Sequence, residues 1–306
     1  MFTKILFATS GSPCCDAAAR VAFDLAARYN AKLFVFHVLG TPSRGFSQVV
    51  VDLRTGEKVE LDGDYILWVK DELKGTYDRQ LKSGVDCEID AAVGVPHREV
   101  LRKARQEDVD LIVMGASTTG CESDAQEYER HFAGSTLQRV AKASKAPVLV
   151  VNRPVASFWG GFTNIVFGAD FSKGSEHAFK FALRTAKELD ANLHLFHAID
   201  IGSSHGFISQ KELDDRMIEA RDRMRRKYLI QTGDFKKVTA DIWEGIPYIE
   251  IVKYAREKQA DLIIMAHHSK DVSDESAVFG HTLEQVLLRA TCPVASVNRP
   301  DKIQLA

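Results

Sequence analysis

The chain has 306 residues, of which 45% are hydrophobic and 27% charged, and its formal net charge is −2. This length suggests about two domains, and the balanced charge gives no reason to expect nucleic acid or an anionic membrane as a partner. No apolar run approaches the roughly 20 residues of a membrane span. The five cysteines lack the spacing of a metal site or a disulfide framework, so a reducing cytoplasm is the expected location.

Most of the sequence of the first half is repeated, with substitutions, in the second half. The segment KILFATSGS of the first half matches NIVFGADFS 160 residues later, and DLIVMGAS matches DLIIMAHHS 151 residues later. Such a fixed order of repeated segments indicates a duplicated domain. We therefore expect one domain at residues 1–152, a linker at 153–162, which contains proline and a glycine pair, and a second domain at 163–300.

In chain order, each half alternates apolar runs of strand length with segments of helical periodicity. Continuous apolar runs are typical of parallel strands that are covered on both faces. The strands predicted for the first half are 5–8, 33–38, 87–93, 111–114 and 148–151, and each has a counterpart in the second half. A long helix is predicted at about 65–81 and again at about 210–229. This alternation predicts α/β domains with doubly wound parallel sheets, whose ligands bind at the carboxyl ends of the strands.

Two segments of the first half have no counterpart in the second. Residues 48–61 alternate apolar and polar side chains around a Thr-Gly turn, which predicts a hairpin. We interpret this hairpin as a surface decoration, with a lid or a dimer contact as the alternative. The other unmatched segment, at 118–133, is acidic and contains Cys121.

Four motifs recur in the same order in both halves. A polar turn (SGS or DFS) follows the first strand, HV or HA ends the second, G-x-P precedes a helix, and GST or GHT precedes the closing APVLVV or CPVASV run. Together they resemble the universal stress protein family in its tandem two-domain form. The resemblance implies two Rossmann-like domains, similar to adenine nucleotide alpha hydrolases, packed about a pseudo-twofold axis in a stress-response or regulatory protein.

Some members of that family bind ATP or AMP between the ends of the first two strands and the late glycine loop, with slow hydrolysis at best. Loop glycines let backbone N–H groups approach phosphate, and a helix N-terminus favours anions. The resemblance therefore implies an adenine nucleotide, with Mg²⁺ if it is ATP. The binding residues it implies in the first half are Ala8, Thr9, Ser10, Val38, Met114, Gly115, Thr118, Gly134, Ser135 and Thr136. Those in the second half are Asp170, Ala198, Met265, Ser269, Gly280, His281 and Thr282.

The two implied sites differ. Ser10 stands where the family usually has an aspartate that helps to hold the nucleoside, and Thr118 takes the place of a loop glycine. The second half keeps the aspartate as Asp170 but has lost both early loop glycines. The sequence thus favours nucleotide binding in the first half over the second.

Histidines gather around the late loop of the second half, where His267 and His281 are weak candidates for zinc ligands. The favoured alternative is that surface imidazoles have replaced glycines in a degenerate site, so no metal is expected. No Ser/His/Asp or paired-carboxylate arrangement can be placed, and no catalytic residue is predicted.

The sequence predicts a tandem universal stress protein that serves as a stress-response module and binds an adenine nucleotide in one half. Two alternatives stay open: a non-catalytic scaffold that kept the fold and lost the ligand, and a weak ATPase or metal-dependent hydrolase. The closing runs at 148–151 and 294–297 are candidate sheet edges, and their pairing would form an intramolecular pseudo-dimer. A homodimer and an unknown protein partner are further expectations.

Overall fold

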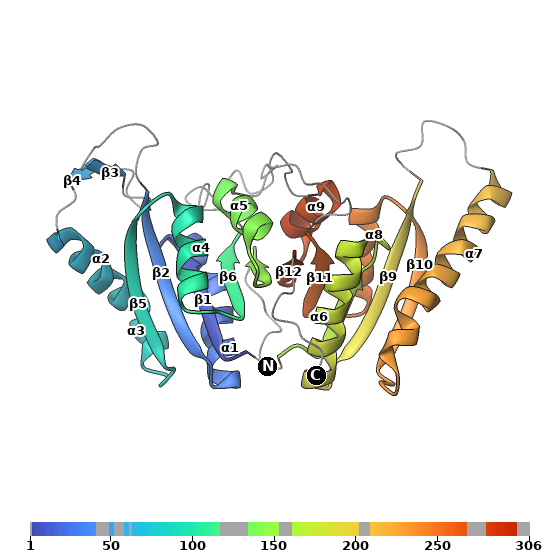
Figure 1. Ribbon diagram of the computed structural model, residues 1–306, viewed down its shortest axis with the longest axis horizontal. Coiled ribbons are helices and arrows are strands. Elements are labelled where there is room, and N and C mark those ends of the chain that lie inside the picture. The colour runs from blue at the N-terminus through green and yellow to red at the C-terminus, as the bar shows by residue number, and fades with distance from the viewer. Residues whose placement is uncertain are drawn as a thin grey trace. The chain divides into compact units, whose positions relative to one another are not determined.

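The computed structural model describes residues 2–40, 49–51, 58–60, 63–116, 134–152, 161–201, 209–267 and 280–298. The chain divides into two compact units, which we call unit 1 (Met1–Pro154) and unit 2 (Val155–Ala306). In Figure 1, unit 1 runs from blue to green and unit 2 from green through yellow to red. No helix of the described residues is long and apolar enough to cross a membrane.

Unit 1 is built on five described parallel strands. β1 (Lys4–Thr9) lies between β2 (Lys32–Gly40) and β6 (Leu111–Gly115). β5 (Cys87–Gly94) pairs with β2, and β7 (Val148–Val151) pairs with β6. The chain proceeds from β1 to β2 and β5 on one side and then returns to β6 and β7 on the other. The resulting switch point between β1 and β6 is where open α/β sheets bind ligands.

Helices cover both faces of this sheet. Those of unit 1 are α1 (Asp16–Tyr29), α2 (Gly63–Thr76), α3 (Asp78–Leu81), α4 (Pro96–Gln106) and α5 (Ser135–Ala143), with the 3₁₀ helix η1 (Pro13–Cys15) before α1. α4 and α5 contact each other and lie in front of the sheet in Figure 1, whereas α1 lies behind it against β1 and β6. Any ligand at the switch point therefore meets the start of α5 and the start of α4.

Unit 2 repeats this topology. Its described strands are β8 (Asn164–Gly168), β9 (Asn192–Asp200), β10 (Val238–Gly245), β11 (Leu262–Ala266) and β12 (Val294–Val297), in the spatial order β10-β9-β8-β11-β12. Its helices are α6 (Lys173–Leu189), α7 (Gln210–Lys227), η3 (Leu229–Thr232), α8 (Pro247–Glu257) and α9 (His281–Arg289). The prediction of two tandem α/β domains with doubly wound parallel sheets is confirmed.

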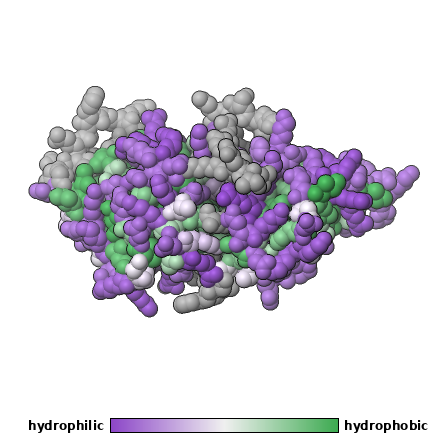
Figure 2. Space-filling model, turned by 60° about the horizontal axis from the view of Figure 1, so that its bottom comes forward, coloured by the Kyte–Doolittle hydropathy of each residue, from purple (hydrophilic) through white to green (hydrophobic). Residues whose placement is uncertain are grey.

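The continuous apolar runs are buried on both faces, as parallel strands require. In β1, Ile5, Leu6 and Phe7 are each 0% exposed. Ala18 and Ala22 on the buried side of α1 are also 0% exposed, and their small side chains let the helix approach the sheet closely. The face in Figure 2 is mostly hydrophilic, with smaller hydrophobic areas between the polar residues.

The prediction of a single helix at about 65–81 is wrong. α2 ends at Thr76 and α3 begins at Asp78, because Tyr77 between them leaves the helical conformation, with φ −105° and ψ 15°. Its ring is 1% exposed and packs edge-on against Phe7, with 5.8 Å between the ring centres. In unit 2, Tyr228 ends α7 in the same way, and η3 follows.

The hairpin predicted at 48–61 is confirmed where the structure describes it. β3 (Val49–Val51) and β4 (Lys58–Glu60) pair antiparallel, with Val50 opposite Val59. The turn between them and the loop at 118–133 lie outside the described residues.

Candidate functional site

A cavity of about 400 Å³ lies at the switch point of unit 1, where β1 and β6 end. Its lining residues are Ala8, Thr9, Ser10, Cys15, Phe36, Val38, Pro96, Val100, Met114, Gly115, Ala116, Gly134, Ser135, Thr136 and Leu137. The cavity thus brings together every residue of the first implied site that the structure describes. Thr118 lies outside the described residues.

Hydroxyl groups fix the end of β1 beside the cavity. The Ser10 side chain is buried, and its Oγ lies 2.7 Å from Ser12 Oγ and 3.3 Å from Cys15 Sγ. Thr9 Oγ1 lies 2.6 Å from the Tyr77 hydroxyl and accepts the Gly11 N–H at 3.0 Å. These contacts order the polar turn at the end of β1.

The wall opposite this turn comes from β2 and α4. Phe36 and Val38 alternate with His37 along β2, so they face the cavity while His37 faces the other side of the sheet. Pro96 and Val100, one turn apart at the start of α4, complete the apolar wall. Phe36, Pro96 and Val100 were not predicted from the sequence, although the strand alternation from Val38 and the helical spacing after Gly-x-Pro indicate them.

The start of α5 supplies the polar side of the cavity. Gly134 is the residue before the helix, and as a glycine it has no side chain to cap the α5 N-terminus. The Gly134 N–H donates to the Ala116 carbonyl at 3.0 Å, which holds the helix start against the end of β6. The first N–H groups of a helix have no acceptor within it and carry partial positive charge. Together with the hydroxyls of Ser135 and Thr136, they form a neutral site that suits an anion.

All described side chains that line this cavity are uncharged. It therefore offers no carboxylate or imidazole as a general acid or base within the described part of the chain. The described residues also contain no group of three or more histidine, cysteine, aspartate or glutamate side chains placed to hold a metal ion. The described lining residues offer a ligand apolar surface and uncharged hydrogen-bonding groups.

The equivalent region of unit 2 is built differently. Asp170 is exposed, and its Oδ1 accepts the N–H of Ser172 at 2.8 Å, which stabilises the turn before α6. Ala198 and Met265 are buried at the ends of β9 and β11. Gly280 precedes α9, whose first residues are His281 and Thr282, and Ser269 lies outside the described residues.

The two histidines considered as zinc ligands, His267 and His281, differ in burial. His267 is 1% exposed, and its Nδ1 lies 3.2 Å from Ser296 Oγ. The interpretation of these histidines as surface imidazoles is therefore wrong for His267, because the end of β11 carries it into the core. His281 is exposed, and its ring meets Tyr248 edge-on at 5.9 Å.

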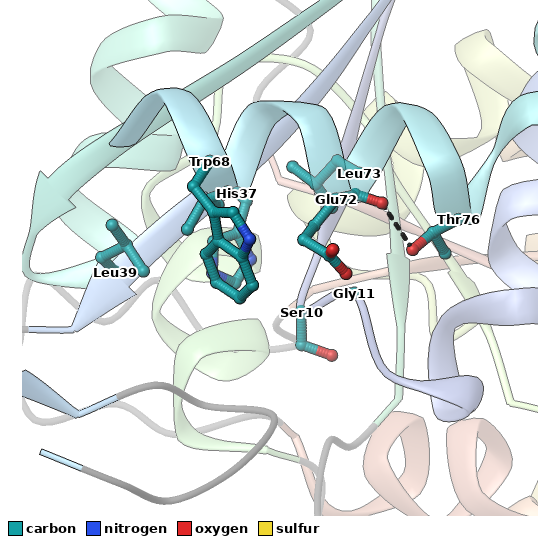
Figure 3. Close-up of a pocket in the computed structure, with 9 residues that line it drawn as sticks. Ser10, Gly11, His37, Leu39, Trp68, Glu72, Leu73 and Thr76 are labelled. Atoms are coloured by element: carbon teal, nitrogen blue, oxygen red, sulfur yellow. Dashed lines mark hydrogen bonds between the residues drawn. The ribbon is translucent and has the colours of Figure 1, made fainter. Parts of the chain in front are cut away.

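A second, smaller pocket of about 40 Å³ lies on the opposite face of unit 1, between α2 and the ends of β1 and β2 (Figure 3). Its lining residues are Ser10, Gly11, His37, Leu39, Trp68, Val69, Glu72, Leu73 and Thr76. This pocket was not predicted from the sequence, and Trp68, which lines it, is 45% exposed. Among the described residues, Ser10 alone lines both of these cavities.

The sequence profile of the universal stress protein family matches residues 1–152 and 161–298. The chain belongs to the universal stress protein family. Universal stress protein MJ0531 of Methanocaldococcus jannaschii is 30% identical over 145 residues, which are 46% of this chain and 85% of that protein. Universal stress protein YxiE of Bacillus subtilis is 28% identical over 159 residues, 49% of this chain and 99% of the relative.

Solved structures of whole tandem length share the fold of this universal stress protein. A universal stress protein from Archaeoglobus fulgidus has a TM-score of 0.61 at 19% identity, covering 98% of this chain and 97% of that one. A functionally unknown protein, PA1789 from Pseudomonas aeruginosa, has a TM-score of 0.63 at 16% identity, covering 98% and 94%. At these identities the likeness concerns the fold alone.

Proposed function

We propose that unit 1 binds an adenine nucleotide, AMP or ATP, in the switch-point cavity, and that the protein serves as a nucleotide-responsive stress module. The observation that carries this proposal is the single cavity lined by every described residue of the first implied site. Its volume of about 400 Å³ falls within the range of about 300–1,000 Å³ that is usual for small-molecule sites.

The chemistry of the walls suits the two ends of a nucleotide. Phe36, Val38 and Met114 offer apolar surface for the base, and the start of α5 with Ser135 and Thr136 offers donors for phosphate. Ser10 replaces the carboxylate at the β1 end with a hydroxyl, which still donates or accepts one hydrogen bond. The described lining residues supply no carboxylate ligand for Mg²⁺, so they do not form a resident metal site.

Isothermal titration of the full chain with AMP, ADP and ATP tests the proposal. We expect saturable heat with AMP or ATP that disappears in Val38→Phe, because the larger side chain fills the cavity. Ala198 is the equivalent position of unit 2, so Ala198→Phe serves as the matched control and is expected to keep the binding. Absence of heat with all three nucleotides, from a protein that is folded by circular dichroism, would reject nucleotide binding.

The second candidate function is a scaffold that kept the fold without a ligand. It is favoured by the missing carboxylate at Ser10 and by Asp170, which bonds to its own turn. Under this alternative, Gly134→Val keeps full activity in a stress-survival assay. Loss of survival with an intact fold counts against the scaffold and for the ligand.

The hydrolase alternative has a direct test of its own. Phosphate release from ATP is measured with and without Mg²⁺ or Zn²⁺. A rate no faster than that of buffer removes this alternative and leaves the binding proposal standing.

A further inference from the structure

In each unit, a histidine at the equivalent position of the second strand contacts the backbone at the end of the first strand. His37 Nδ1 lies 2.9 Å from the Thr9 carbonyl oxygen, and His197 Nδ1 lies 2.7 Å from that of Ala169. Two residues beyond each carbonyl, the chain adopts a left-handed conformation, with φ 73° at Gly11 in unit 1 and φ 63° at Phe171 in unit 2. The backbone conformations at Gly11 and Phe171 are therefore alike, but only Phe171 carries an aromatic ring.

In unit 2 that ring is buried in a pocket of its own. Phe171 is 5% exposed, and its ring centre lies 4.3 Å from that of His197. It stacks on Tyr228 at 6.0 Å with an interplanar angle of 18°, and the guanidinium carbon of Arg223 lies 4.8 Å from its centre. An imidazole, a phenol and a cation thus surround a planar aromatic group on the α7 side of the sheet.

In unit 1 the residue equivalent to Phe171 is Gly11. Gly11 has no side chain, and the small pocket of about 40 Å³ opens there instead, beside His37. Figure 3 shows Trp68 and Glu72 projecting from α2 toward the end of β1. In the repeat, Glu72 takes the position of Arg223 and Trp68 that of Glu219, as the alignment of Tyr77 with Tyr228 requires.

We propose that this pocket is a second ligand site, which takes a small planar aromatic cation in the place that the Phe171 ring fills in unit 2. The aromatic character follows from the equivalent ring, and the charge follows from the exchange of Arg223 for Glu72. A cation beside the indole face of Trp68 also gains a cation–π interaction, for which tryptophan is the best partner.

The geometry fits a ring that enters by its edge. The pocket, with a volume of about 40 Å³, holds only the leading edge, and the remaining surface of the ring lies against Trp68, which is 45% exposed. The site is separate from the nucleotide proposal. His37 and Leu39 line this pocket, whereas Phe36 and Val38 line the large cavity on the other face of β2.

The test uses the full chain and three probes of one shape: benzamidine as the cation, benzamide as the neutral molecule and benzoate as the anion. Ligand-detected NMR and protein NMR titrations give the dissociation constants. We expect the affinity order benzamidine, benzamide, benzoate. Glu72→Gln should remove the preference for benzamidine over benzamide, and Trp68→Ala should weaken benzamidine by about 2- to 5-fold, the range of an exposed cation–π contact. Both side chains lie on the exposed side of α2, so both variants are expected to fold.

Gly11→Phe provides the decisive variant, since Phe171 shows that phenylalanine tolerates this backbone conformation. The new ring should fill the pocket and abolish benzamidine binding. In that background, Phe171→Gly opens the equivalent place beside Arg223, and benzoate should then bind better than benzamidine. The proposal is overturned if benzamidine does not bind at millimolar concentration, or if it binds equally well to Gly11→Phe. Neither result depends on whether nucleotides bind.

Discussion

The hydroxyl groups of Thr9 and Tyr77 lie 2.6 Å apart in the core of unit 1. Thr9 ends β1, and Tyr77 separates α2 from α3, so this hydrogen bond joins segments 68 residues apart in the chain. Both cavities of unit 1 begin at this strand end, because Thr9 lines the large one and the next residue, Ser10, lines both. The position of Tyr77 therefore bears on both proposed sites.

Tyr77→Phe tests the energetic value of this hydrogen bond. Burial raises the pKa of the Tyr77 phenol, with the hydrogen bond to Thr9 acting against that shift, so the hydroxyl stays protonated at ordinary pH. Its removal should lower the free energy of unfolding by about 1–2 kcal/mol, measured by urea denaturation. The control, Tyr248→Phe, changes a half-buried tyrosine whose ring contacts remain. We expect its effect to stay within about 0.5 kcal/mol; equal losses in both variants would contradict the prediction.

Gly11→Ala separates backbone strain from crowding. A Cβ at Gly11 meets only Leu73, at an ordinary 3.5 Å, but φ is 73°. The left-handed conformation costs alanine about 1 kcal/mol of stability, so the midpoint of denaturation should fall. Gly75 lies within α2 with nothing within 4 Å of an added Cβ, and Gly75→Ala should raise stability by about 0.5–1 kcal/mol. Stabilisation by both alanines would show that the Gly11 backbone carries no strain.

Stability should fall as the pH is lowered through the range of histidine titration. Burial lowers the pKa of His197, and the hydrogen bond to the Ala169 carbonyl opposes that shift. Because an unfolded histidine has a pKa of about 6.5, the unfolded state binds the proton first, and stability is lost from about pH 7 downward until folded His197 also protonates. Burial lowers the pKa of His194 and His97 in the same direction.

Denaturant titrations at pH 7.5, 6.5 and 5.5 measure this dependence. His197→Gln should make the loss smaller. A protein that becomes more stable on acidification over this range would show that the sign is wrong.

The N-terminus of α5 should dominate any phosphate contact. If unit 1 binds AMP, replacing Ser135 and Thr136 together by alanine removes two hydroxyl donors to the charged phosphate and should weaken AMP binding by about 100-fold or more, at roughly 1.5 kcal/mol or more per hydrogen bond to a charged group. Thr282→Ala removes the one hydroxyl at the equivalent position, the start of α9 in unit 2, and should leave the affinity unchanged. Equal weakening in both variants would place phosphate contacts in both units.

The sequence by itself determined the fold, because strands that are buried on both faces require continuous apolar runs. The duplication of the domain repeats these runs in the second half. The sequence also indicated part of the lining of the switch-point cavity, because strand ends and helix starts are local features, but it did not indicate Phe36, Pro96 or Val100. Tertiary structure alone decided what depends on contacts between distant segments. It breaks the predicted long helix at Tyr77, buries His267 and sets the Phe171 ring against His197. Periodicity indicates only the face of a helix or strand on which a residue lies. The residue that it contacts there depends on the tertiary packing of distant segments.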